Sequence, residues 1–170
     1  MGVESEAAAV YWSRLRAILP EELNFQRRIR RGAGDSVNAC INYGYGILYT
    51  KVFSKITRAR LDPYVGFFHT IRSGKTSLLF DTIEMFRQYF VDRPVISWLN
   101  KKGKPEFDSS GKLQRKTRSR IAKLVLDRHN SRVHYKGKME VAENIMQTKI
   151  RELAKAMKNE ITFSALTWPW

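Results

Sequence analysis

Helical periodicity covers most of this chain, and it limits the possible folds more than any other feature. Over residues 3–19 apolar side chains recur at a spacing near 3.6 residues, which is typical of an amphipathic helix. No strand-rich region and no internal repeat is visible. The 170 residues are enough for one hydrophobic core, so we expect an all-α fold in a single domain, residues 1–170. Further helices are predicted over 36–60, 77–90, 113–130 and 138–158, with another beginning near Pro94.

Proline, glycine and capping residues mark the ends of these helices. Pro20 closes the first, and Asp35 or Ser36 can cap the second. Gly44 and Gly46 each weaken the second helix by roughly 1 kcal/mol relative to alanine. We therefore expect a neighbouring helix to approach closely at these glycines. Residues 100–112 form a basic excursion, for which a hairpin is one interpretation.

The charge balance favours a polyanionic partner. The chain has 31 Lys and Arg against 16 Asp and Glu, a net charge of +15. The basic residues cluster at 27–31, 100–104 and 112–123. This clustering favours nucleic-acid binding over the alternative of a basic surface that is merely solvated. One cysteine excludes an intrachain disulfide and fits a reducing compartment. We expect no membrane helix and no secretory signal.

Acidic side chains on the helix predicted over 77–90 need an explanation. Asp81 and Glu84 lie one turn apart, so they fall on one stripe of the helix, opposite an apolar stripe, and are expected to point the same way. His69 ends the loop before this helix. Two interpretations stay open: a core network neutralised by Arg72, Lys75 or Arg87, and a metal site that needs a third ligand.

Glu4 is a candidate for that third ligand. It lies in the first turn of the first helix and is followed by three alanines, which leave room for a helix or a substrate to pass. A single glutamate in a first turn is more often a partner of the helix dipole. Glu4 alone therefore decides nothing.

Five segments in order resemble one known family. They are "GVESEAAAVYW", "DSVNACINYGYGIL", "LDPYVGFFH", "SLLFDTIEMFR" and "VDRPVISWLN". Together they resemble the catalytic helical domain of the CRISPR-associated spacer integrase, the central enzyme of CRISPR adaptation. The resemblance implies that Glu4, His69 and Glu84 are catalytic metal ligands, with Asp81 as an acidic neighbour and occasional ligand.

The sequence departs from the family pattern at two points. Ser5 stands where the family usually has glycine, which affects the backbone beside Glu4 and not the ligand itself. The N-terminal β-rich domain of ordinary members is also missing. We therefore expect a compact or N-terminally truncated form of the family, without the usual support for dimerisation.

The resemblance further implies a reaction and its partners. The expected function is a metal-dependent DNA integrase and endonuclease that joins the 3′-OH ends of short spacer DNA into a CRISPR repeat by transesterification. The expected cofactor is Mg²⁺ or Mn²⁺. Expected partners are double-stranded DNA and further copies of the chain in a dimer or tetramer. A companion adaptation protein is possible but is not required, and the location is the prokaryotic cytoplasm. Two alternatives remain: a nuclease that only cleaves, and a non-catalytic nucleic-acid-binding module.

Several residues are predicted to contact DNA or to lie at the surface. Trp168 and Trp170 are expected to dock on the core or on a sister subunit, and the apolar tail is a candidate oligomer contact. His129 and His134 are expected to be exposed or near DNA. The candidate DNA-binding residues are Arg72, Lys75, Arg27, Arg28, Arg30 and Arg31.

Overall fold

The computed structural model describes residues 2–30, 32, 34–68 and 74–168, without the side chains of Val3 and Glu4. The predicted all-α class is confirmed, with one small two-stranded sheet in addition. No helix in the described part is long and apolar enough to cross a membrane. The elements are α1 (Val3–Ile18), η1 (Glu21–Leu23), α2 (Ser36–Arg58), α3 (Ser77–Arg87), η2 (Gln88–Asp92), α4 (Arg93–Asn100), α5 (Arg115–Asn130), β1 (Arg132–Tyr135), β2 (Lys138–Val141) and α6 (Ala142–Met157).

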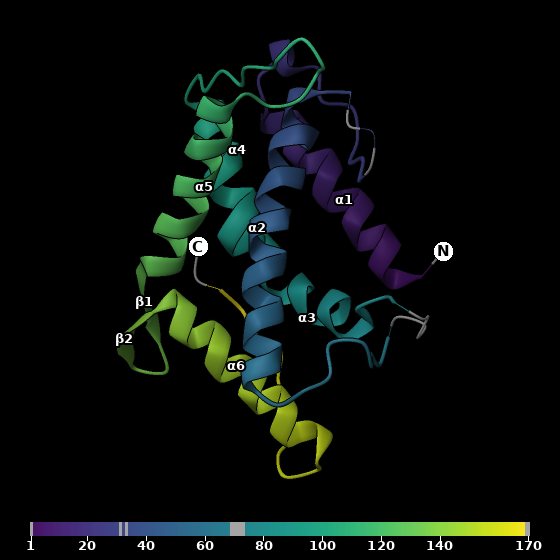
Figure 1. The fold of residues 1–170 in the computed structure, drawn as a ribbon, viewed down its shortest axis with the longest axis vertical. Helices are drawn as coiled ribbons and strands as arrows, with labels where there is room; N and C mark the ends of the chain where they lie inside the picture. The colour runs from purple at the N-terminus through teal and green to yellow at the C-terminus, as the bar shows by residue number, and fades with distance from the viewer. Residues whose placement is uncertain (1, 31, 33, 69–73, 169–170) are drawn as a thin grey trace.

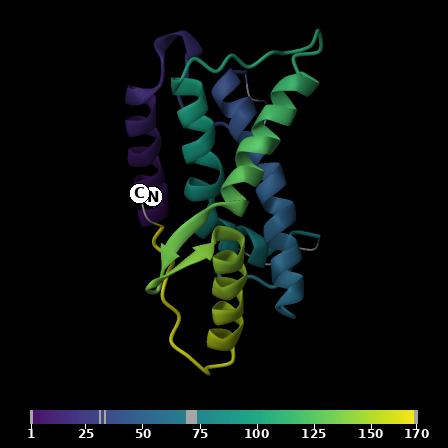
Figure 2. The ribbon, with the colours of Figure 1, turned by 90° about the vertical axis from the view of Figure 1, so that its left-hand side faces the viewer.

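Helix α2 is the centre of the fold. It packs against α3, α4, α5 and α6, and Figure 1 shows it running through the middle of the molecule, with α1 along one side. Asp35 is its N-cap, because the Asp35 side chain accepts a hydrogen bond from the Asn38 amide at 2.8 Å. Seen from the side in Figure 2, α4, α5 and α2 lie next to one another.

The two glycines of α2 have different surroundings. A Cβ atom added at Gly44 would lie 2.6 Å from Cγ1 of Val91, so the expected close approach is confirmed there. At Gly46 an added Cβ would meet nothing within 4 Å, so the same prediction was wrong for that residue. The sequence alone does not distinguish them, because both lie in one polar and aromatic stretch of the helix.

The helices before and after residue 90 are one continuous helix. Residues 77–100 are helical throughout, and η2 is a π-helical turn inside this segment. The wider turn directly precedes Pro94, whose ring would clash with the Phe90 carbonyl in a regular helix. The chain changes direction at this turn, so that α3 and α4 run differently in Figure 1.

A β-hairpin replaces the expected start of the last helix. β1 and β2 pair antiparallel, with His134 opposite Met139, and α6 begins only at Ala142. Lys136 and Gly137 have φ of 48° and 83°, the positive values of a type I′ hairpin turn. The prediction of helix over 138–141 was therefore wrong. The alternation in "RVHYKGKMEV" around Lys-Gly was the available signal.

The basic excursion forms a second, shorter turn. Phe107 and Leu113 make an isolated antiparallel bridge, and the Gly111 amide donates to the Asp108 carbonyl at 2.9 Å. The hairpin interpretation is therefore confirmed for the second half of this segment, around the bridge between Phe107 and Leu113.

His129 belongs to the core. It is 1% exposed, and its ring stacks on Phe90 with the centroids 4.3 Å apart. The expectation of an exposed or DNA-proximal His129 was wrong, because α5 buries the stripe that contains Ile121, Val125 and His129. His134 is exposed, as predicted.

The C-terminal tail covers the molecule's own core. The Trp168 ring stacks on Tyr89 at 4.0 Å, and its Nε1 donates to the Met85 carbonyl at 3.0 Å. Docking of Trp168 on the core is confirmed, whereas the role of the tail as an oligomer contact stays a prediction. The buried indole of Trp168 is not part of an exposed apolar strip, although Phe163 and Leu166 are only partly buried. Trp170 lies outside the described residues.

Candidate active site

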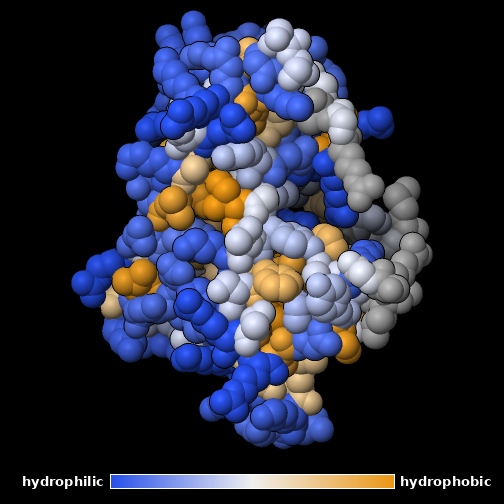
Figure 3. Space-filling model, viewed as in Figure 1, coloured by the Kyte–Doolittle hydropathy of each residue, from blue (hydrophilic) through white to orange (hydrophobic). Residues whose placement is uncertain are grey.

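A cleft of about 510 Å³ opens between α1, α2 and α3–η2. Ala7, Ala8 and Tyr11 line it from α1, and Glu84 lines it from α3. Figure 3 shows that hydrophilic residues cover most of the face seen in Figure 1. Its wall combines aromatic and aliphatic side chains with carboxylates, guanidinium groups, amides and phenols.

Glu84 is the accessible acid of this cleft. Its side chain is 40% exposed, and it forms an ion pair with Arg87 one turn further along the helix. The ion pair holds the carboxylate at the cleft wall while leaving oxygen lone pairs accessible to a ligand. Glu84 is therefore in a position to bind a cation or a proton donor that enters the cleft.

The face of α1 that carries Glu4 lies across the cleft. Position 4 is one turn before Ala7 and Ala8, which both line the cleft, so the three positions share a face of the helix. Two acidic positions, Glu4 on α1 and Glu84 on α3, thus belong to elements that border the same cavity.

Asp92 is a buried acid at the base of the cleft. Its oxygens accept hydrogen bonds from the Tyr11 hydroxyl at 2.9 Å and the Tyr45 hydroxyl at 2.8 Å. Burial raises the pKa of Asp92 from 3.8 to about 6, while the two hydroxyls and the charges of Arg28 and Arg87 lower it. Asp92 therefore ties α1 and α2 to the π-helical turn.

Three arginines give the cleft its positive charge: Arg28, Arg30 and Arg87. The Arg28 guanidinium donates to Oδ1 of Asn38 at 2.8 Å and lies 5.1 Å from the centroid of the Tyr45 ring. Arg87 lies 5.0 Å from the same ring. Held in place by these contacts, the guanidinium groups are suited to bind phosphate oxygens.

Asp81 has a different environment from Glu84. It is 9% exposed, and its Oδ2 accepts hydrogen bonds from the amides of Phe67 at 2.7 Å and Phe68 at 3.0 Å. An added Cβ at Gly66 would lie 2.7 Å from the same oxygen. Asp81 thus anchors the loop that leads into His69.

The two acids of α3 do not share a cavity. Asp81 lines an apolar pocket beside Phe67 and Phe68, whereas Glu84 lines the cleft. The sequence pattern predicted that they point the same way. The 100° turn per residue places positions i and i+3 about 60° apart, and the loop at 66–68 covers only the Asp81 side.

The other predicted site residues are placed as follows. Lys75 lies with its Nζ 5.6 Å from the ring centroid of Phe80, a residue that lines the cleft. Arg27 and Arg30 are exposed, whereas Arg28 is partly buried. His69, Arg72 and Arg31 lie outside the described residues. Among the residues that are described, no three His, Cys, Asp or Glu side chains form a metal-sized cluster.

Sequence reasoning missed Asp92 and its two tyrosines. The available signal was an acid within the apolar segment "YFVDRPVI", a position where burial requires partners. Tyr11 and Tyr45 lie 81 and 47 residues away in the sequence, so the pattern along the chain does not connect them.

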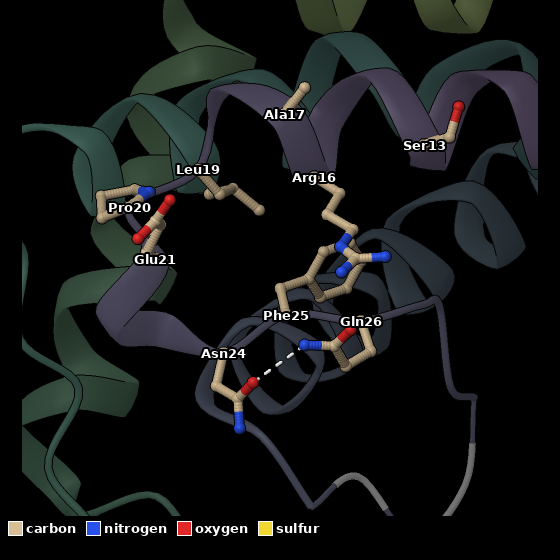
Figure 4. Close-up of a pocket in the computed structure, with 9 residues that line it drawn as sticks. All are labelled: Ser13, Arg16, Ala17, Leu19, Pro20, Glu21, Asn24, Phe25 and Gln26. Atoms are coloured by element: carbon tan, nitrogen blue, oxygen red, sulfur yellow. Dashed lines mark hydrogen bonds between the residues drawn. The ribbon is translucent and has the colours of Figure 1, made fainter.

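A second cavity of about 410 Å³ lies at the other end of α1, between Arg16 and the segment 19–26. Figure 4 shows its lining, with Nε2 of Gln26 donating to Oδ1 of Asn24 at 2.9 Å. It contains none of the predicted site residues.

Comparison with known proteins identifies the family. Residues 1–126 match the family model described as CRISPR associated protein Cas1. The chain belongs to the Cas1 family. The resemblance seen in the sequence is therefore confirmed for the larger part of the chain.

Individual Cas1 relatives agree with this assignment. A CRISPR-associated endonuclease Cas1 from Archaeoglobus fulgidus is 32% identical over 181 aligned residues, which cover 100% of this chain and 52% of that protein. The chain spans about half the length of the curated relatives it matches.

Two solved structures share the fold. A casposase bound to integration product has a TM-score of 0.85 at 30% identity, over 94% of this chain and 47% of that one. A Cas1 protein from Thermotoga maritima has a TM-score of 0.82 at 26% identity, over 90% of this chain and 50% of that one.

Proposed function

We propose that this chain is a DNA integrase and endonuclease that joins the 3′-OH ends of short spacer DNA into a CRISPR repeat. The observation that carries the proposal is the cleft, where an exposed carboxylate, Glu84, and three arginines face the helix that bears Glu4. A cleft of this composition can hold a phosphodiester and supply negative ligands beside it.

The donor chemistry fits a divalent cation. Glu84 offers carboxylate oxygens at an accessible wall of the cleft. On α1, which also lines the cleft, Ala7 and Ala8 have small side chains that leave space for a ligand. Glu4, His69 and Glu84 are the proposed ligands. Asp81, which holds the loop before His69, is proposed as an acidic neighbour and occasional ligand. Carboxylates suit Mg²⁺, and an imidazole ligand favours Mn²⁺. When bound, the cation would lower the pKa of the attacking hydroxyl and neutralise charge on the phosphate.

The chain's own residues would bind and orient the DNA. Arg28 and Arg87 are held by Tyr45 and Asn38, so their guanidinium groups lose little further freedom when a phosphate binds. Arg87 is paired with Glu84, and a ligand on Glu84 would release Arg87 toward the phosphate. Asp81 would set the approach of His69 by holding the amides of Phe67 and Phe68.

The printed descriptions of similar proteins support this reaction class. The Archaeoglobus relative is described as an endonuclease, which also favours the alternative of a nuclease that only cleaves. The casposase was solved with an integration product. Water in place of the 3′-OH as the nucleophile gives cleavage at the same cleft, so both reactions need the same residues.

The test compares Glu84→Gln with Glu160→Gln, a matched change at an exposed surface position. A short duplex with free 3′-OH ends is incubated with supercoiled plasmid and Mn²⁺ or Mg²⁺. Glu84→Gln, Glu4→Ala and His69→Ala should each abolish joining while DNA affinity stays near wild type, since affinity is mostly phosphate neutralisation. Near-normal joining by His69→Ala or Glu84→Gln would overturn the assignment. Cleaved products without joined products would favour the nuclease.

Metal binding has a readout that does not depend on activity. Mn²⁺ should raise the melting temperature of the wild-type chain and should raise it less for Glu84→Gln. Equal shifts in both proteins would exclude Glu84 as a ligand.

Assembly follows from the substrate. A spacer has two ends, whereas the described part of the chain shows one cleft with Glu84 in its wall, so we propose a dimer or tetramer for integration of both ends. Duplex DNA would offset the repulsion between subunits of charge +15. Light scattering with and without a short duplex measures this. A companion adaptation protein remains an optional partner in this scheme.

A further inference from the structure

Another cavity, of about 670 Å³, lies between α4 and α5, and we call it the basic groove. Five cationic side chains line it: Arg93, Lys101, Lys102, Arg120 and Arg128. Asp127 is its acidic lining residue, and both oxygens of that carboxylate accept from Nζ of Lys123 at 2.9 and 3.0 Å. The excess of positive charge in the groove is therefore not balanced by its own wall.

Arg128 is preorganised at the base of the groove. Its guanidinium lies 4.3 Å from the centroid of the Tyr89 ring, and its Nε donates to the Tyr89 carbonyl at 3.3 Å. The Tyr89 ring is in turn stacked on Trp168 at 4.0 Å. This stack holds a guanidinium group at the groove and lowers the entropy lost when an anion binds.

Arg93 adds a second guanidinium beside the first. It lies 5.8 Å from the same Tyr89 ring. Burial, and after it the positive charge of Arg128, lower the pKa of Arg93. Like charges gathered in this way cost stability, and an anion in the groove would offset that cost.

The turn after α4 brings two lysines to the groove. Gly103 folds against Trp98 so closely that an added Cβ would lie 2.5 Å from the indole. Lys102 adopts a positive φ of 63° in this turn. The turn thus places Lys101 and Lys102 at one end of the groove, while Arg120 and Arg128 extend along α5.

The groove is separate from the cleft. Asp92 lines the cleft and the next residue, Arg93, lines the groove, so the helix that contains η2 and α4 divides the two cavities. A DNA segment in the groove would therefore lie on the far side of this helix from Glu84. Two DNA segments repel each other as polyanions, so a separate basic surface for each would reduce the cost of holding both on one protein.

We propose that the basic groove binds the phosphodiester backbone of a DNA segment that does not enter the cleft. The identity of the bound molecule as DNA rests on the proposed function, whereas the anion-binding property rests on the groove alone. Guanidinium and ammonium groups in such a groove are expected to contact phosphates rather than base edges. Phosphate contacts carry no sequence information, so we expect little sequence preference.

The test measures duplex DNA binding by fluorescence anisotropy between 50 and 300 mM salt, with the full chain. Lys101→Gln/Lys102→Gln is compared with Lys155→Gln/Lys158→Gln, an equal loss of charge at exposed positions on and after α6. The groove variant should reduce the logarithmic salt slope by about 2 and the affinity at 100 mM salt about tenfold or more. The control should change both much less.

A second groove variant guards against a local folding defect in the turn. Arg120→Gln, on the opposite wall, should reduce the slope by about 1, and its melting temperature should match wild type. Equal slopes for groove and control variants, or an unchanged slope for both groove variants, would overturn the proposal.

The outcome is distinguishable from failure of the proposed function. Glu84→Gln tests joining at the cleft, and it should leave the salt slope unchanged. If the groove variants keep the wild-type salt slope and joining still depends on Glu84, only the groove proposal is rejected. If the groove variants reduce the salt slope but Glu84→Gln still joins DNA normally, only the assignment of the cleft is rejected.

Discussion

The hydroxyl of Tyr11 on α1 donates a hydrogen bond to the buried carboxylate of Asp92 at 2.9 Å, across 81 residues of sequence. This contact ties the helix that carries Glu4 to the turn between α3 and α4. The Trp12 ring packs at a tilt of 55° against Phe25, with the ring centroids 6.1 Å apart. The position of α1 therefore depends on a few side-chain contacts near residues 11 and 12.

Tyr11→Phe should loosen α1. It removes one hydrogen bond to a buried carboxylate, which costs about 1.5–3 kcal/mol. Amide hydrogen exchange should speed up in α1 more than in α2 or α5. Tyr64→Phe is the control, because Tyr64 is 45% exposed. A uniform change across all helices, or none, would contradict the role of this contact.

The two glycines of α2 form a matched pair. Gly44→Ala should destabilise the protein by about 1–3 kcal/mol, because its methyl group meets Val91 in a packed interface. Gly46→Ala should be stabilising by about 0.5–1 kcal/mol, since helix propensity improves and the methyl has free space. Urea unfolding measures both. Equal effects of the same sign would mean that packing at Gly44 is not as the structure has it.

His129 should make the protein sensitive to acid. Burial lowers the pKa of His129 from 6.5 to about 4. As the pH falls, the histidine is therefore protonated in the unfolded chain at a higher pH than in the folded protein. Stability from His129 is complete above pH 6.5 and is lost as the pH falls toward 4, by about 2 kcal/mol at pH 5. Asp92 has the opposite sign, because its pKa is raised from 3.8 to about 6 and protonation relieves its burial.

The two contributions are separated by His129→Leu. Between pH 7 and pH 5 the variant should gain about 2 kcal/mol relative to wild type in unfolding free energy, measured by urea titration at each pH. His134→Leu, at an exposed histidine, should run parallel to wild type. A His129→Leu curve parallel to wild type would refute the assignment of the acid sensitivity to this residue.

Asp81→Ala should free the loop before His69. The amides of Phe67 and Phe68 lose their common acceptor, so peptides covering 64–68 should exchange hydrogen faster. Joining activity should fall, because His69 follows directly in the chain, while DNA affinity stays the same. Asp108→Ala, which alters a turn in another hairpin, is the control. Unchanged exchange at 64–68 would show that Asp81 does not anchor the loop.

The sequence alone was sufficient for features that depend on neighbouring residues. The first long helices, the Asp35 cap and the apolar stripe of α3 follow from periodicity and capping, which act within about one or two turns. The five segments also identified the family. Glu84 lies outside the apolar stripe of α3, and the structure places it in the wall of the cleft. The ligand roles of Glu4, His69 and Glu84 stay predictions.

Only the tertiary structure decided which face of each element is covered. Asp81 and Glu84 are one turn apart, yet a loop covers the first and leaves the second accessible. His129 is a polar residue type, but the packing of α5 buries it against Phe90. Trp168, near the end of the chain, stacks on Tyr89 and covers it. Asp92 finds its partners on α1 and α2. These contacts join residues tens of positions apart, so their burial and charge environment depend on how the helices pack rather than on any local pattern.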